Sequence, residues 1–327
     1  MGQLQNKTTL QKSKNSFLNE IRGRLLEFSC AKAFASFYNI EFEFLESLDL
    51  NFISELQQYQ DYLKQNDHRS YRYIENAGKE LIKKIELDKT SNIKKILMTG
   101  QWQINEQFKE ADIVVQGETE ELYSIKLIKK NSYINSKSAG IKSLFEKYFG
   151  EVEVQRRLNQ NVELYFENFR IDFYSHFDCP LDEVNFLELI KKHKISDRPG
   201  ELPSELSQIL FDFYKKCIDD LHHHFSSLLK KDKEVFLQNI YPLVGFGNKN
   251  LKVLTFFHCQ NFQTLDLSVH DWSILKTSNV KILPVSGNTS FLIELDHLSL
   301  QVRVKPMNSY LAPSMKVNCS VKFKDEK

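Results

Sequence analysis

The sequence lacks the short motifs that mark several common enzyme classes. Its 327 residues contain no Gly-x-x-x-x-Gly-Lys-Ser/Thr phosphate loop and no Gly-x-Gly-x-x-Gly fingerprint, so nucleotide hydrolysis lacks its usual parts. They also contain no His-Glu-x-x-His, no Gly-x-Ser-x-Gly nucleophile elbow and no pair of Cys-x-x-Cys motifs. These absences exclude the common zinc proteases, the serine hydrolases built on that elbow, and zinc knuckles.

Cysteines and long apolar runs are also scarce. The five cysteines are odd in number and irregularly spaced, which argues against a disulfide framework. No apolar run approaches the ~20 residues needed to span a bilayer. The first residues, MGQLQNKTTLQKSKNS, are polar and lack the apolar core of a signal peptide. We therefore expect a protein of the reducing cytoplasm.

The chain has almost no excess of charge of either sign. Its 44 Lys and Arg residues nearly balance 43 Asp and Glu residues, giving a net charge of +1. A uniformly basic surface is therefore excluded, and any contact with nucleic acid must use local patches of Lys and Arg. A hydrophobic content of 41% with 27% charged residues is ordinary for a globular protein, and the length suggests one large domain or two.

The most informative stretch lies between residues 110 and 150. A short apolar run follows Asp112, a turn at Gly117 comes next, and a second β-branched run spans residues 122–128. Two such runs joined by a short acidic turn predict a β-hairpin. The hairpin sets Asp112 near the start of one strand and Lys126 on its neighbour. A carboxylate beside a lysine on paired strands is typical of metal-dependent nucleases, where the carboxylate holds Mg²⁺ and the lysine acts on the attacking water.

This segment resembles the PD-(D/E)xK nuclease superfamily, in which Asp, a spacer and then acid-x-Lys carry the cleavage. The position of the acid holds Ser124, a poor Mg²⁺ ligand, so a second carboxylate must come from elsewhere. Among type II restriction endonucleases, the HaeIII-like enzymes carry such a serine, and the chain is similar to them at three places. These places are the helix motif Gly-Arg-x-x-Glu-aromatic at residues 23–28, the Ser-Ile-Lys strand at 124–126, and the terminal strands with Arg-Val-Lys at 303–305 and Ser-Met-Lys at 314–316.

The resemblance implies a role for each residue of the site. Asp112 would ligate Mg²⁺ together with the carbonyl of Ile125 and the carboxylate of Glu27, which replaces the missing acid. Lys126 would polarise the nucleophilic water, and Ser124 would shape the metal shell through water. The substrate would be double-stranded DNA, cut to leave 5′-phosphates within a restriction-modification system. A cognate methyltransferase would act on the same site without needing to bind this chain, and symmetric cutting would favour a homodimer.

Apolar periodicity predicts the remaining architecture. We expect helices over residues 16–38, 40–65 and 71–87, and then a strand over 93–98. The fold class is therefore α/β in the α+β sense, with a restriction-endonuclease-like core of a mixed central sheet flanked by helices. A helical insertion and a C-terminal β-rich region complete it. The expected domains are a helical arm and nuclease core at 1–150, a mainly helical region at 151–245 and a β-rich, DNA-contacting region at 246–327. All three could also form one compact unit.

Two polar segments are candidates for DNA contact. The segment after Lys126 reads as a basic loop leading to a helix capped by Ser136 or Ser138, and helix N-termini favour phosphate. The alternating strands of the last third predict an antiparallel sheet with one wet face, and Arg and Asn pair with guanine and adenine edges. The residues expected to contact DNA are Lys129, Lys130, Asn131, Asn135, Ser136, Lys137, Ser138, Lys142, Arg303, Lys305, Asn308, Lys316 and Asn318.

Three alternatives stay open at the level of sequence. A defence or repair nuclease without strict sequence preference would use the same site. A DNA-binding protein whose nuclease centre has decayed would explain Ser124. A soluble α/β scaffold would show no salt-sensitive DNA binding.

Overall fold

The computed structural model of this chain divides into two compact units, which are described separately. It describes the backbone of residues 2–16 and, with side chains, residues 17–85, 87, 92–99, 108, 110–181, 184–246, 250–259, 262, 265–276, 279–287, 289–306 and 309–324. Unit 1 comprises Met1–Ser132 and Asn248–Ile274, and unit 2 comprises Tyr133–Gly247 and Leu275–Lys327. The chain leaves unit 1 and later returns to it, so the boundaries expected after residues 150 and 245 differ from those of the structure.

Unit 1 is a mixed sheet covered by helices, as the sequence predicted for the central sheet. Its helices are α1 (Gly2–Phe37), α2 (Glu41–Glu46), α3 (Leu50–Asn66) and α4 (His68–Lys84). Its strands, in spatial order, are β1 (Lys95–Met98), β2 (Ile113–Gln116), β3 (Glu120–Lys129), β5 (Leu251–His258) and β6 (Asp266–His270). Among the described strands of this sheet, β3 and β5 pair in parallel and the other neighbours pair antiparallel. The predicted hairpin forms between β2 and β3.

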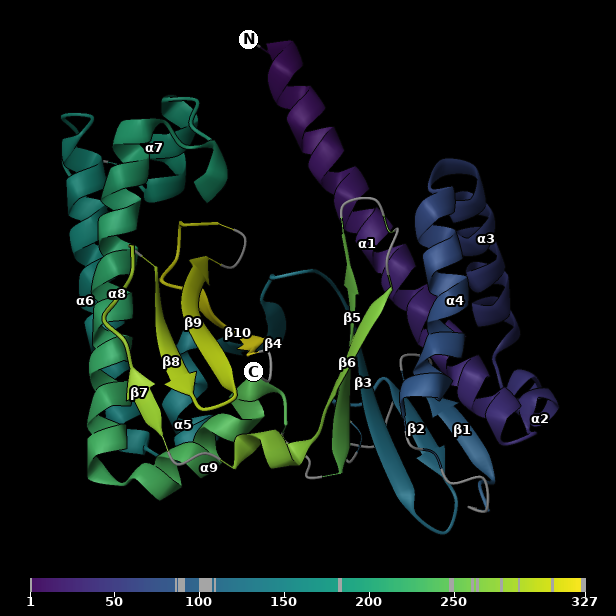
Figure 1. The fold of residues 1–327 in the computed structure, drawn as a ribbon. Helices are drawn as coiled ribbons and strands as arrows, with labels where there is room; N and C mark the ends of the chain where they lie inside the picture. Colours follow the sequence, from purple (N-terminus) through teal and green to yellow (C-terminus); the bar gives the residue numbers. More distant parts are fainter. Residues whose placement is uncertain are drawn as a thin grey trace. The chain divides into compact units, whose positions relative to one another are not determined.

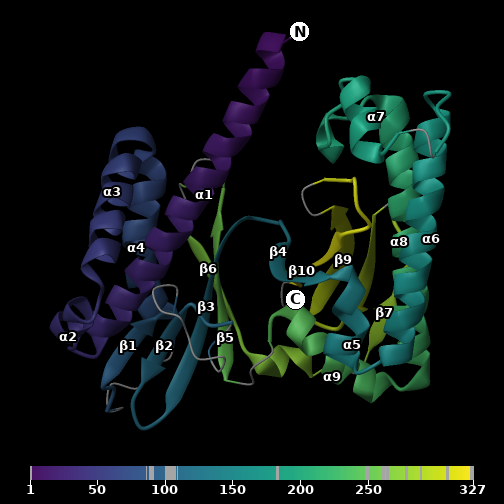
Figure 2. The same ribbon diagram turned by 180° about the vertical axis from the view of Figure 1, so that it is seen from behind.

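One face of this sheet forms the core of unit 1. Ile125 of β3 and Leu254 of β5 are buried in the same cluster as apolar residues of α1 and α4. The ring of Tyr123 lies 4.7 Å from that of Phe34 on α1, and Figures 1 and 2 show α1 and α4 lying over the sheet. The strands of the last third do not form one antiparallel sheet as expected, because β5 and β6 join the central sheet, where β5 pairs in parallel with β3 and antiparallel with β6.

The contact between α1 and α4 depends on a glycine. A Cβ at Gly78 would lie 2.7 Å from the carbonyl oxygen of Ser29 and 2.9 Å from the Cβ of Ala33. This close approach also lets the Ser29 hydroxyl donate to the carbonyl of Ile74 at 2.8 Å. The close packing of α1 against α4 therefore rests on the absence of a side chain at residue 78.

We expect Gly78→Ala to destabilise unit 1, although alanine is the better helix former by about 1 kcal/mol. A clash with backbone cannot be relieved by a rotamer change, and overpacking of this kind costs about 1–3 kcal/mol. The net loss should therefore be up to about 2 kcal/mol, measured by urea unfolding. Gly23→Ala on α1 is the control, because nothing lies within 4 Å of its Cβ position. Equal stabilisation by both changes would contradict the proposed close contact.

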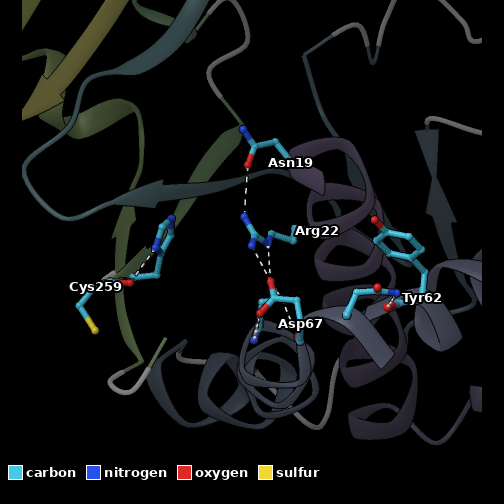
Figure 3. A network of polar contacts seen from close by, with 8 residues as sticks. Asn19, Arg22, Tyr62, Asp67 and Cys259 are labelled. Atoms are coloured by element: carbon cyan, nitrogen blue, oxygen red, sulfur yellow. Dashed lines mark hydrogen bonds and ion pairs between the residues drawn. The ribbon is translucent and has the colours of Figure 1, made fainter. Parts of the chain in front are cut away.

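A second contact joins α1 to the start of α4 (Figure 3). The Arg22 guanidinium donates twice to Asp67 Oδ2, at 2.5 and 3.1 Å, and once to Asn19 at 3.4 Å. Asp67 is also the N-cap of α4, accepting from the backbone and hydroxyl of Ser70. Burial raises the pKa of Asp67, but the Ser70 and Arg22 hydrogen bonds outweigh it and lower the pKa below its usual value. This carboxylate stabilises the α1–α4 packing as an anion.

Unit 2 is an antiparallel sheet packed against helices. Its helices are α5 (Leu144–Phe149), α6 (Val152–Ser175), α7 (Phe186–Lys192), α8 (Ser204–Lys231) and α9 (Lys233–Val244). Its strands, in spatial order, are β4 (Ile134–Gly140), β10 (Met315–Phe323), β9 (Leu298–Pro306), β8 (Ser290–Leu295) and β7 (Val280–Ile282). The ring of Phe291 on β8 contacts those of His222 and Phe225 on α8 at 5.2 and 5.6 Å. The chain is thus a mixed α+β protein.

The expected basic loop and capped helix after Lys126 were wrong in part. Residues 134–140 form strand β4, which pairs with β10 along its length. The helical segment starts later, at Ile141, and neither Ser136 nor Ser138 caps it. The polar residues 134–140 carry no local strand signal, because the strand that pairs with them, β10, lies near the other end of the chain.

In the described part of the chain, no helix is both long and apolar enough to cross a membrane. All five cysteines lie in this part, and no two of them form a disulfide.

Candidate active site

Asp112 directly precedes β2 and lies at the end of the β2–β3 ladder where Ile113 pairs with Tyr123. The last registered pair is Ile113 with Tyr123, so the backbone of β3 beyond Tyr123 has no β2 residue opposite it. The Asp112 carboxylate occupies this position. Its Oδ2 accepts hydrogen bonds from the Ser124 hydroxyl at 3.0 Å and the Ile125 backbone N–H at 2.6 Å. The ladder thus ends in a carboxylate held by two groups of the neighbouring strand.

Lys126 completes this cluster. Its Nζ lies 3.3 Å from the same Asp112 Oδ2, and the two side chains are 32% and 26% exposed. The hydroxyl-bearing residue beneath them, Ser124, is buried. The structure therefore brings together the two residues that the hairpin prediction paired, in a position that solvent and a ligand can reach.

Glu27 is the second carboxylate of the site. Burial, and next the negative charge of Asp112, raise the pKa of Glu27 to about 7, while Arg24 and Lys126 oppose the shift. These interactions place the α1 carboxylate within electrostatic reach of both Asp112 and Lys126. Sequence reasoning assigned no role to Arg24, although its spacing three residues before Glu27 puts both on one helix face.

The contact made by Ile125 differs from the one that the family resemblance implies. The resemblance assigns its carbonyl to the metal, whereas the group that contacts Asp112 is its backbone N–H. The N–H fixes the carboxylate, and the carbonyl of Ile125 stays a predicted metal ligand.

The donor set fits Mg²⁺ better than a transition metal. Among the described residues, no group of three or more His, Cys, Asp or Glu side chains is arranged to hold a metal ion. Mg²⁺ is commonly held by one or two protein carboxylates, with waters and substrate phosphate filling its other positions. Asp112 and Glu27 could supply these carboxylates, because burial and the negative charge of Asp112 raise the pKa of Glu27, and a shared cation would offset the repulsion between the two acids.

The residues expected to contact DNA fall in both units. In unit 1, Lys129 ends β3 and Lys130 and Asn131 follow in the turn, and all three are exposed. Lys130 lies 3.7 Å from Asp266, and Asn131 adopts a left-handed turn conformation with φ of 68°. The remaining ones that the structure describes belong to unit 2.

One face of the unit 2 sheet gathers five of these residues, which we call the polar face. Ser138, Asn318 and Arg303 are registered neighbours on β4, β10 and β9, and Lys316 is registered with Lys305 one row away. The Ser138 hydroxyl donates to Asn318 Oδ1 at 2.8 Å. The opposite phase of β9 and β10 is buried against the helices, so the alternation in the sequence correctly predicted a wet face.

The other expected contacts are placed differently. The Ser136 hydroxyl lies between the carbonyls of Leu243 and Cys319, at 2.6 and 3.0 Å, which makes it a structural residue. Lys142 forms an ion pair with Glu163 on α6. Asn135 and Lys137 lie on β4, opposite Ser320 and Cys319. Asn308 lies outside the described residues.

A scan against protein-family models and searches of curated proteins and of solved structures find no match to this chain.

Proposed function

We propose that this protein is a Mg²⁺-dependent endonuclease that cuts double-stranded DNA at specific sequences, in the manner of a type II restriction enzyme. The observation that carries the proposal is the contact between Asp112 and Lys126 at the end of the β2–β3 hairpin, with Glu27 of α1 close enough for both charges to act on its pKa. A helix carboxylate, a strand aspartate and a strand lysine around one point are what phosphodiester hydrolysis requires. The mixed sheet behind α1 supports a restriction-endonuclease-like core, and we propose that it works in the cytoplasm.

Each residue of the site has a separate proposed role. Asp112 and Glu27 would hold Mg²⁺, which when bound lowers the pKa of water and withdraws charge from the phosphate. The Ser124 hydroxyl and the Ile125 N–H keep the Asp112 carboxylate in one orientation. Lys126 has three N–H donors and no acceptor. Beside a phosphodiester, its ammonium would orient the attacking water and stabilise the negative charge that develops on the phosphate.

The polar face of unit 2 is proposed to contact the duplex. Lys305 and Lys316 would meet phosphates, whereas Arg303 and Asn318 carry the groups that read guanine and adenine edges. Specific recognition would serve a restriction-modification system, in which a cognate methyltransferase protects the same sequence. Two copies of the chain would cut a symmetric site.

We expect the combined change Arg303→Gln, Lys305→Gln and Lys316→Gln to weaken duplex binding and to lower its salt dependence, because contacts between cations and phosphates are lost. Each cation lost from a phosphate should reduce the magnitude of the slope of log K against log salt by about 1, so the loss of Lys305 and Lys316 should reduce it by up to about 2. The loss of Arg303 should weaken recognition of the base sequence. Fluorescence anisotropy with a labelled duplex over a salt series measures this slope. Lys215→Gln is the control, because Lys215 lies on α8 and is paired with Asp219. An unchanged slope in the triple variant would exclude the polar face.

Plasmid digestion tests the proposed function directly. Purified protein incubated with plasmid DNA and Mg²⁺ should give discrete fragments, and EDTA should stop the reaction. A smear would favour a defence or repair nuclease without strict sequence preference.

A second candidate is a DNA-binding protein whose catalytic centre has decayed. It is favoured by one observation, the hydroxyl of Ser124 in place of the usual acid, bonded directly to Asp112. It predicts salt-sensitive duplex binding without cleavage under Mg²⁺, Mn²⁺ or any other divalent ion.

A further inference from the structure

A row of polar residues crosses the central sheet of unit 1 beside Lys126. In the sheet register, Lys126 of β3 is paired with Thr255 of β5, and Thr255 is paired with Ser268 of β6. Registered residues on neighbouring strands project from the same face of a sheet. The Thr255 and Ser268 hydroxyls, which we call the hydroxyl row, therefore continue from the Lys126 side chain towards the sheet edge.

The hydroxyl row is buried and has no partner in the described part of the chain. Thr255 is 0% exposed, and neither its Oγ1 nor Ser268 Oγ forms a hydrogen bond with any described residue. Thr255 interrupts the run Leu-Lys-Val-Leu-Thr-Phe-Phe, where Val253 and Phe256 are buried apolar neighbours. Leaving a buried hydroxyl unpaired is unfavourable, and valine would fit the same space without that penalty. A hydrogen-bond partner for the Thr255 hydroxyl would therefore be favourable.

Lys126 is the registered neighbour of Thr255 on β3 and carries donors that a hydroxyl oxygen can accept. Its ammonium has three N–H donors, and one contact, to Asp112 at 3.3 Å, is made in the structure. If Asp112 ligates a cation, its carboxylate oxygens are shared between the cation and Lys126. The Lys126 ammonium then has fewer acceptor positions at Asp112 and would donate to other acceptors. A threonine hydroxyl on the adjacent strand offers one, either directly or through a buried water, which needs two to four polar partners.

We propose that Thr255 is a positioning residue for Lys126, and that Ser268 completes the polar site that holds the lysine ammonium beside the reacting phosphate. This inference rests on the proposed nuclease function and extends its site to β5 and β6. The hydroxyl row would keep Lys126 in one position whether or not Asp112 is engaged, and so support its action on the attacking water.

Cleavage by Thr255→Val measures the contribution to catalysis. The single-turnover rate with Mg²⁺ should fall about 10-fold to 100-fold, because a small misplacement of a catalytic group has effects of this size. The affinity for duplex DNA should stay the same. Thr255→Ser should restore most of the rate, since it keeps the hydroxyl, and Ser268→Ala should show a smaller loss. An unchanged rate in Thr255→Val, with a raised urea midpoint, would overturn the inference and mark the hydroxyl as merely unpaired.

A spectroscopic measurement separates this inference from the proposed function. In ¹⁵N-lysine-labelled protein without DNA, the Lys126 ammonium should give a signal protected from solvent exchange in the parent and in Thr255→Ser. Thr255→Val should lose that protection, and Lys126→Arg assigns the signal. If the parent cuts no DNA but shows this pattern, the nuclease proposal fails while the positioning of Lys126 stands. Equal exchange in the parent and Thr255→Val would overturn the positioning role.

Discussion

Asp112→Asn is expected to reduce DNA cleavage at least about 10³-fold while leaving duplex binding intact. Asparagine keeps the shape of aspartate, and its side-chain carbonyl can still accept from the Ser124 hydroxyl and the Ile125 N–H. It loses the negative charge that would hold Mg²⁺ and that pairs with Lys126 at 3.3 Å. Removing a ligand from a catalytic metal acts on the chemical step, whereas the phosphate contacts that supply DNA affinity lie elsewhere.

Single-turnover cleavage and fluorescence anisotropy on the same preparation test this prediction. Asp219→Asn is the matched control, because it removes a carboxylate paired with Lys215 on α8 and should cut at the parental rate. Asp112→Ala should be equally inactive, which would show that charge rather than shape is required. Cleavage by Asp112→Asn at the parental rate would remove Asp112 from the site and refute the nuclease assignment.

Glu27→Gln is expected to abolish Mg²⁺-dependent cleavage and, in metal-free protein, to increase stability at pH 8 but not at pH 4.5. Burial and the nearby Asp112 raise the pKa of Glu27 from 4.5 to about 7. Between these values the native state binds more protons than the unfolded state, so the stability of the parent falls as pH rises. The contribution is fully present below pH 4.5 and is lost as pH passes through 7. Glutamine never ionises and avoids this loss.

Urea unfolding with EDTA measures the difference. At pH 8 the free energy of unfolding of Glu27→Gln should exceed that of the parent by up to about 3 kcal/mol, since each pKa unit corresponds to about 1.36 kcal/mol. Glu20→Gln, an exposed position on the same helix, should show no such gain. Mg²⁺ should then stabilise the parent at pH 8 and leave Glu27→Gln unchanged. A Glu27→Gln variant less stable than the parent at pH 8 would contradict the conclusion that burial and the negative charge of Asp112 raise the pKa of Glu27.

Local sequence patterns determined the elements and the first half of the site. Apolar residues at helical spacing predicted α1, and β-branched runs around Gly117 predicted the hairpin that pairs Asp112 with Lys126. Alternation in the last third predicted the polar face that carries Arg303 and Lys305. These features follow from periodicities of 3.6 and 2 residues, which are properties of short segments.

Only the tertiary structure decided which segments meet. The run at residues 251–258 joined the central sheet in parallel with β3, which brought Thr255 beside Lys126. Polar residues 134–140 became a strand because β10 offered an edge. The raised pKa of Glu27 likewise depends on α1 lying over the sheet that carries Asp112. Partner choice between distant strands and helices is set by packing and burial over the whole chain, and a local pattern contains no information about it.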